Sequence, residues 1–461
     1  MPSFDTSPTL TAWRMLLALA VVFVLLATTG WTTIRHQRTP GQTRQEALAA
    51  WAHDRVGKRA LPDAAAPART IAAFFASIGP AQGARLADTH PLVVGNLNGA
   101  PVTLRYRANR VSLKSALDAE RPRVDDPRLT ADGRHEALRR VHRFASLMSP
   151  GRQILAFDPS GTGRTAEVLG DLERARRVSV IVPGVDTNLL TFQKTARRYS
   201  APAGMADALY AAERRAEPRT KTAVIAWADY TAPVGVGIEA AIGRLAETGA
   251  VRLVDLTAAL PGDSRVSLFC HSYGSVLCGV AASRLPGRVT DVVVAGSPGM
   301  RAESAADLGT RARVWAMRDA DDWIADVPHM ELGGVGHGAD PVAPEFGARL
   351  LSADGAVGHA GYFEPGTRSL ENFAAIGAGA YDRLTCAGAG SGRDGAGEDG
   401  GGDGGGDGGG DGTGGLETRW SGGRDGGAGG SGRPDEDAAG SAAESGAGAV
   451  ESACLGGISG A

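Results

Sequence analysis

The run Val266–Gly279 constrains the fold of this chain more than any other segment. Its β-rich start, Val266–Phe269, leads into Ser272, and a helix-like pattern begins directly after that serine. A strand, a sharp turn and a helix in this order form a nucleophile elbow, which holds a serine hydroxyl exposed above a sheet. The turn needs small residues two positions before and after the serine. Gly274 meets this need, whereas Cys270 stands where glycine is usual.

Short apolar runs that alternate with helical stretches predict an α/β fold with a mostly parallel sheet flanked by helices. The run Val178–Val182 is typical of a strand buried on both faces. The first two runs are joined by the turn Asp158–Gly163, which predicts a hairpin and an antiparallel edge. Ser272 then falls at the carboxyl end of a strand, where sites on such sheets lie. The expected strands are 153–157, 165–169, 178–182, 223–227, 266–269, 292–295, 314–317 and 346–351.

Shifts in composition divide the chain into five parts. We expect a leader over 1–38, a linker with a short helix (43–58) over 39–69, and a helical extension over 70–150. The main α/β domain spans 151–385 and ends with a helix at 369–384. The Gly/Asp-rich tail, 386–461, lacks the recurring aliphatic residues of calcium-binding repeats, so we expect it to be disordered.

The leader contains one apolar run, Met15–Trp31, at the lower limit of length for crossing a bilayer. Arg14 precedes it and no Ala-x-Ala cleavage pattern follows, which favours a transmembrane signal anchor over a cleaved signal peptide. We therefore expect a single-pass protein of the cell membrane, held through residues 15–31, with its body outside the cytoplasm. It would be secreted if the segment were cleaved.

The formal net charge is -3, and the basic residues are scattered without a Lys/Arg block, which argues against nucleic-acid binding. The four cysteines show no metal-binding pattern. Cys270 and Cys278 are expected to be small buried thiols. Cys386 and Cys454 flank the tail and could pair in an oxidising compartment, and their spacing leaves this open.

A nucleophilic serine needs a carboxylate and a histidine, which follow the serine in that order in this architecture. Asp319, Asp321 and Asp322 all come shortly after the strand 314–317. Asp322 is favoured because a loop of several residues must lift the carboxylate toward the histidine. A role in a turn or a helix cap is the alternative for each of them.

Three later histidines compete for the role of base. His359 is favoured because it lies in a loop directly before the final helix, where such a base is expected. His337 is the second choice, since it follows Asp322 too closely for an intervening strand, and His329 is the third. His271 precedes the acid in the chain, and we expect it to pack beneath the elbow.

The oxyanion that forms during attack needs backbone donors. The residue after the serine supplies one amide, that of Tyr273, and the loop after 178–182 supplies the other, with Val185 first and Asp186 second. Gly184 allows a close turn there. No dinucleotide or phosphate-binding fingerprint is present, and neither a metal nor an organic cofactor is expected.

Several ordered motifs together resemble an actinobacterial family of α/β-hydrolases that is catalogued as a domain of unknown function. The likeness covers roughly residues 70–384. It implies an α/β-hydrolase fold and a serine triad, and it supports Ser272, Asp322 and His359 by position without supplying a substrate. Cys270 departs from the glycine of the family pattern. The motifs are His271–Ser275, Val294–Gly299, Gly336–Pro341, Phe346–Arg349 and Gly358–Phe363, with Val93–Pro101 and Arg107–Arg110 upstream.

These observations predict a membrane-anchored or exported serine hydrolase of the esterase/lipase type. It would cleave an ester, thioester or amide of a small-molecule or lipid-like acyl substrate through an acyl-enzyme. Two alternatives remain: a non-catalytic cell-surface binding module on the same scaffold, and an acyltransferase that acts on an envelope acceptor.

Overall fold

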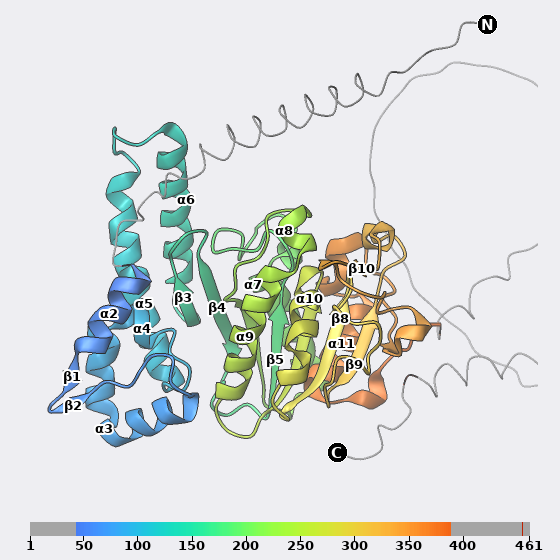
Figure 1. Cartoon of the computed structure of the whole chain (residues 1–461), viewed down its shortest axis with the longest axis horizontal. Coiled ribbons are helices and arrows are strands. Elements are labelled where there is room, and N and C mark those ends of the chain that lie inside the picture. The colour runs from blue at the N-terminus through green and yellow to red at the C-terminus, as the bar shows by residue number, and fades with distance from the viewer. Residues whose placement is uncertain (1–42, 389–453, 455–461) are drawn as a thin grey trace, which may run out of the picture.

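The computed structural model describes residues 43–388 and Cys454, and an eight-stranded sheet forms its centre (Figure 1). The strand order is β12-β9-β8-β7-β5-β6-β4-β3. Strand β4 runs antiparallel to β3 and β6, and every other pair in this sheet is parallel. The predicted mostly parallel sheet with an antiparallel edge is confirmed. The strands are β3 (Gln153–Asp158), β4 (Arg164–Gly170), β5 (Arg177–Val182), β6 (Thr222–Ala228), β7 (Arg265–His271), β8 (Val289–Ala295), β9 (Arg313–Met317) and β12 (Arg349–Leu350).

Helices cover both faces of the sheet because its central strands are apolar on both sides. In β5, Val180 contacts the core beneath α9 and α10, whereas Ile181 contacts the core beneath α7 and α11. This alternation follows from the two-residue period of a strand. The helices are α7 (Pro202–Ala216), α8 (Ile238–Ala241), α9 (Arg244–Ala259), α10 (Tyr273–Ala281) and α11 (Arg368–Ala378).

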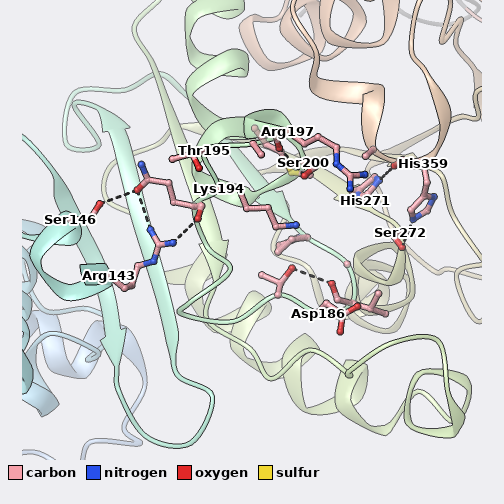
Figure 2. A pocket seen from close by; sticks show the side chains of 18 residues that line it. Arg143, Ser146, Asp186, Lys194, Thr195, Arg197, Ser200, His271, Ser272 and His359 are labelled. Carbon is pink, nitrogen blue, oxygen red and sulfur yellow. Dashed lines mark hydrogen bonds between the residues drawn. The ribbon is translucent and has the colours of Figure 1, made fainter. Parts of the chain in front are cut away.

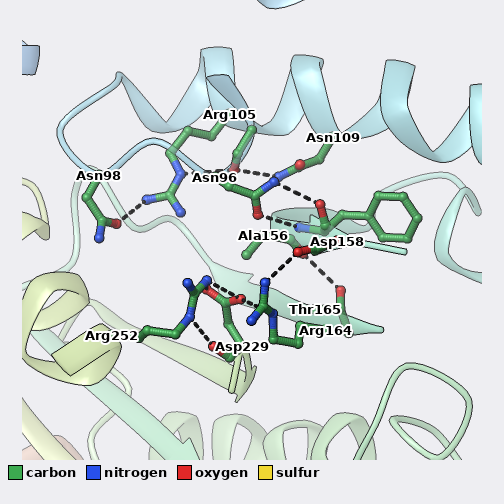
Figure 3. Close-up of polar contacts among 12 residues, drawn as sticks. Asn96, Asn98, Arg105, Asn109, Ala156, Asp158, Arg164, Thr165, Asp229 and Arg252 are labelled. Atoms are coloured by element: carbon green, nitrogen blue, oxygen red, sulfur yellow. Dashed lines mark hydrogen bonds and ion pairs between the residues drawn. The ribbon is translucent and has the colours of Figure 1, made fainter. Parts of the chain in front are cut away.

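The N-terminal helices cover the β3 edge of the sheet. Buried residues from the span Ala47 to Ala108 form a small core, whereas Phe144 and Leu147, further along the chain, belong to the core of the main sheet. Asn96 pairs with the backbone of Phe157 in β3 through two hydrogen bonds of 2.8 and 3.0 Å, as a neighbouring strand would (Figure 3). Asn109 donates to the carbonyls of Gly95 and Ile154, both at 2.9 Å. The exposed polar groups of an edge strand are thereby satisfied. These helices are α2 (Arg44–His53), α3 (Ala68–Thr89), α4 (Pro91–Val94), α5 (Val102–Glu120) and α6 (Ala131–Leu147).

Some boundaries differ from those expected, for local reasons. The helix predicted over 43–58 ends at His53, and the hairpin β1 (Arg55–Val56) and β2 (Arg59–Ala60) follows it. The final helix stops at Ala378 because Gly379 adopts a left-handed φ of 82°. The strand expected over 346–351 shrinks to β12, since a 3₁₀ turn occupies residues 344–346. A second small hairpin joins β10 (Glu331–Leu332) and β11 (Val335–Gly336).

The prediction of a transmembrane helix and signal anchor, and with it a single-pass membrane location, is corrected. Across residues 43–388, no helix has the length and apolar character needed to cross a membrane. The apolar run 15–31 itself lies outside the described residues, as does the tail expected to be disordered from 389 onward, Cys454 excepted. The division of the chain at residues 39, 70, 151 and 386 remains a proposal.

Candidate active site

The strand β7 and the helix α10 meet at Ser272 in a sharp turn. Ser272 adopts φ 56° and ψ -130°, an unusual conformation for a residue other than glycine. Its neighbours make this possible by lacking side chains: a Cβ on Gly274 would lie 2.2 Å from the Val182 carbonyl oxygen, and one on Gly184 would lie 2.6 Å from Ser272 Cβ. The turn therefore presents the serine at the carboxyl edge of the sheet.

The cysteine at the position usually held by glycine forms a disulfide. Cys270, the penultimate residue of β7, is bonded to Cys278 in α10, with 6.5 Å between the two Cα atoms. The expectation that both would be free buried thiols is therefore wrong. The disulfide closes a covalent loop around Ser272 and ties the strand to the helix that together hold it. Cys386 and Cys454, whose pairing was left open, are also bonded.

A continuous chain of hydrogen bonds links Ser272, His359 and Asp322. Ser272 Oγ lies 2.8 Å from His359 Nε2, and His359 Nδ1 lies 2.8 Å from Asp322 Oδ1 and 3.1 Å from Oδ2. Because a carboxylate only accepts, Nδ1 carries the ring proton, and Nε2 accepts the hydrogen bond from the Ser272 hydroxyl. The structure thus brings together the three side chains that the sequence singled out.

Asp322 is held in its charged form. Its side chain is fully buried, which by itself would raise the pKa of the carboxyl group. Hydrogen bonds from His359, Tyr362 and the Ile324 amide outweigh burial and bring the pKa below its ordinary value. The Tyr362 hydroxyl, 2.6 Å from Asp322 Oδ2, is a contact that the sequence analysis missed.

Three further side chains hold the segment that carries His359, a 3₁₀ helix over Gly358–Phe363. His271 Nε2 donates to the His359 carbonyl at 2.6 Å, and burial first, with the nearby His359 second, lowers the pKa of His271 to about 3, so it stays neutral. The Asp319 carboxylate accepts from the Gly358 amide at 2.7 Å. The Trp323 ring packs on the His359 ring with centroids 4.8 Å apart. These contacts fix the imidazole from several sides.

The two backbone amides expected to form the oxyanion hole come from the start of α10 and from the loop after β5. Tyr273 is the first residue of α10, so its amide has no partner within the helix. Val185 lies in the loop after β5, directly beyond Gly184, and lines the same cavity as Ser272. Among the described residues the Val185 amide donates to no other group. Asp186, the second choice, donates its amide to the Pro233 carbonyl at 2.9 Å.

The other candidates lie apart from this chain of hydrogen bonds. His337 is buried and packs edge-on against the Tyr273 ring, and burial first, with Arg301 second, lowers its pKa to about 4. His329 Nε2 lies 3.3 Å from the Ser297 carbonyl oxygen. Asp321 donates its amide to the Asp319 carboxylate at 3.3 Å. Within residues 43–388, neither a hydrogen bond nor an ion pair joins any of these three residues to Ser272.

A cavity of about 760 Å³ opens in front of Ser272 and His359 (Figure 2). The β5 loop with Gly184 and Val185 forms one wall, and the segment 193–197 forms another. Helix α6 of the N-terminal extension contributes Arg143 and Ser146. In the part of the chain that the structure describes, no group of three or more His, Cys, Asp or Glu side chains could hold a metal ion.

The fold and this site define the class of the protein: it has an α/β-hydrolase fold and carries a serine at the nucleophile elbow. A family model described as alpha/beta hydrolase matches residues 158–332, which supports a hydrolase in general. The resemblance to an actinobacterial family of unknown function is confirmed: the chain is similar to an uncharacterized Mycobacterium tuberculosis protein, 27% identical over 386 residues, with 71% of this chain and 58% of that protein covered. The chain thus spans 58% of the length of the first curated relatives it matches.

Further relatives and solved structures match parts of the chain. An uncharacterized protein of Mycobacterium bovis is 28% identical over 215 residues, covering 43% of this chain and 72% of that one. A dienelactone hydrolase from Anabaena variabilis shares 18% identity over 48% of this chain and 93% of its own, with a TM-score of 0.30. A carboxyl esterase from Bacillus coagulans shares 13% identity over 34% and 46%, with a TM-score of 0.20.

Proposed function

We propose that the protein is a serine hydrolase that cleaves an ester, thioester or amide through an acyl-enzyme. The observation that carries this proposal is the hydrogen-bonded chain from Ser272 through His359 to Asp322, whose two links are both 2.8 Å long. A serine hydroxyl at its ordinary pKa is a weak nucleophile, and a base in hydrogen-bond contact activates it.

The proposed roles of these residues follow from their contacts. His359 Nε2 takes the proton from Ser272 Oγ as that oxygen attacks the carbonyl carbon, and it returns the proton to the leaving group. Asp322 orients the imidazole and stabilises its charged form. The amides of Tyr273 and Val185 stabilise the negative oxygen that forms. Water, activated by His359 in the same way, then releases the acyl group and restores the serine.

A fluorophosphonate probe, which labels activated serines covalently, tests the proposal. We expect the full chain to be labelled and Ser272→Ala to abolish labelling. Ser283→Ala is the matched control, because this exposed serine follows α10 and lies outside the cavity. Absence of labelling in a folded wild-type protein would refute the proposal and favour a non-catalytic binding module on this scaffold.

A further inference from the structure

The cavity in front of Ser272 has an unbalanced charge. Its lining carries three cations, Arg143, Lys194 and Arg197, against one carboxylate, Asp186. This carboxylate already has a partner within the chain, since Asp186 Oδ1 accepts a hydrogen bond from the Gly235 amide at 2.8 Å. The remaining titratable side chains of the lining, His271 and His359, belong to the elbow and its base.

The three cations are held differently. Arg143 is half-buried, and its guanidinium donates to the Leu190 carbonyl at 2.8 Å and to the Gln193 carbonyl at 2.5 Å, so its charge lies against the loop. Lys194 and Arg197 are exposed, and within residues 43–388 neither side chain has a hydrogen bond or an ion pair. Both cations are therefore free to bind a partner from outside the described residues.

The loop directs these two cations toward the nucleophile. Figure 2 shows Lys194 and Arg197 between Arg143 and Ser146 at one end of the cavity and Ser272 and His359 at the other. Arg197 adopts a left-handed φ of 46°, so the chain turns sharply where this side chain leaves the loop. Exposed cations are common on protein surfaces, but these two share a cavity with the serine, where low-dielectric walls concentrate their field.

We propose that the substrate is an ester that carries an anionic group, a carboxylate or a phosphate, a few bonds from the scissile carbonyl. This inference rests on the proposed function, since it concerns the same cavity. Lys194 and Arg197 would bind the anion while Ser272 attacks the ester. Arg143 would act indirectly, as a positioning residue that keeps the loop in place.

Three 4-nitrophenyl esters of one chain length test the charge preference of the full chain. They are the neutral hexanoate, the adipate monoester with a terminal carboxylate, and the cationic 6-aminohexanoate. We expect kcat/KM to fall in the order anionic, neutral, cationic. A fourth ester that ends in a phosphonate separates a phosphate-like preference from a carboxylate preference, and either preference supports the proposal.

The double variant Lys194→Met, Arg197→Met assigns the preference to these side chains. We expect it to lower the ratio of kcat/KM for the adipate monoester to that for the hexanoate about tenfold, with the hexanoate value kept within about twofold. Arg198→Met is the matched control, because Arg198 adjoins Arg197 but pairs with Asp207 at 2.5 Å, outside the cavity. In 0.5 M NaCl the wild-type ratio should also fall, since salt screens exposed charges.

The possible failures are distinguishable. If Ser272 is labelled by the fluorophosphonate and the hexanoate is cleaved, but neither anionic ester is preferred or the double variant keeps the preference, the charge proposal is overturned and the hydrolase stands. If no ester is cleaved and Ser272 is not labelled, both proposals are overturned.

Discussion

The glycine that follows strand β8 allows Asp322 and His359 to meet, and a single methyl group there should separate them. Gly296 has a φ of 56°, and a Cβ at this position would lie 2.7 Å from Asp322 Oδ2, 3.1 Å from His359 Nδ1 and 3.1 Å from Tyr362 Cε2. Ordinary van der Waals contact begins near 3.4 Å. Gly296→Ala therefore forces the carboxylate, the imidazole or both to move by several tenths of an ångström or more.

The expected cost follows from that displacement. A misplacement of about 1 Å in a catalytic group lowers the rate about 100-fold, which corresponds to roughly 2.7 kcal/mol of transition-state stabilisation. The left-handed φ adds a separate cost to folding of about 1–2 kcal/mol for any residue with a Cβ. Loss of activity and loss of stability must therefore be measured separately.

Gly262→Ala is the matched control. Gly262 has a φ of 60°, and a Cβ there would meet nothing within 4 Å, so this variant bears the backbone cost without the clash. We expect urea denaturation to show a similar backbone cost in both variants. We expect kcat/KM for the best ester of the panel to fall about 100-fold only in Gly296→Ala. If the folded Gly296→Ala protein stays within about threefold of wild type, the proposed dependence on the Asp322–His359 contact is refuted.

Three further predictions follow from the same site. Asp322→Asn should lower kcat by about 10³–10⁴, because an amide does not select the His359 tautomer; retained kcat would argue against that role. Tyr362→Phe removes a hydrogen bond that lowers the Asp322 pKa. The stability linked to this carboxylate, present above its unfolded value near 3.8 and lost as pH falls through the folded value, should then be lost at higher pH, as acid-denaturation midpoints would show. Replacing both Cys270 and Cys278 by alanine should lower the free energy of unfolding by about 2.5 kcal/mol, from the eight-residue separation of the disulfide, and an unchanged urea midpoint would contradict this.

Much of the architecture could be predicted because it depends on local patterns. Alternation and apolar runs located the strands of the main sheet, and the strand-turn-helix pattern placed Ser272 at its carboxyl edge. Chain order limited the acid and the base to a few candidates, and the length of the loop after 314–317 favoured Asp322, while a position directly before the final helix favoured His359. The structure places these two side chains in contact. Short elements at the far edge, such as β12, were harder to predict since tertiary contacts decide their length.

The contacts that were missed depend on how distant segments pack. Tyr362 lies three residues after His359, and residues at this spacing share a face of a 3₁₀ helix. The contact was missed because no sequence pattern predicts a 3₁₀ helix at this position. The apolar strand and helix patterns predict buried thiols at Cys270 and Cys278, and only the elbow, which folds the helix back along the strand, brings the two sulfurs together. Asp319 was considered a competitor of Asp322, and it instead holds the loop that carries His359.

Helix α6 contacts the loop 190–197, so the shape of the cavity depends on a part of the chain that carries none of the proposed catalytic residues. Substrate preference and catalytic chemistry could therefore change independently during evolution. Arg143 and Ser146 hold that loop through Gln193, and both lie upstream of the segment that the family model matches, 158–332. Changes in these N-terminal helices would therefore alter one wall of the cavity without touching Ser272, Asp322 or His359, which come from other elements. Proteins with the same elbow and different N-terminal extensions would then catalyse the same type of reaction on different substrates.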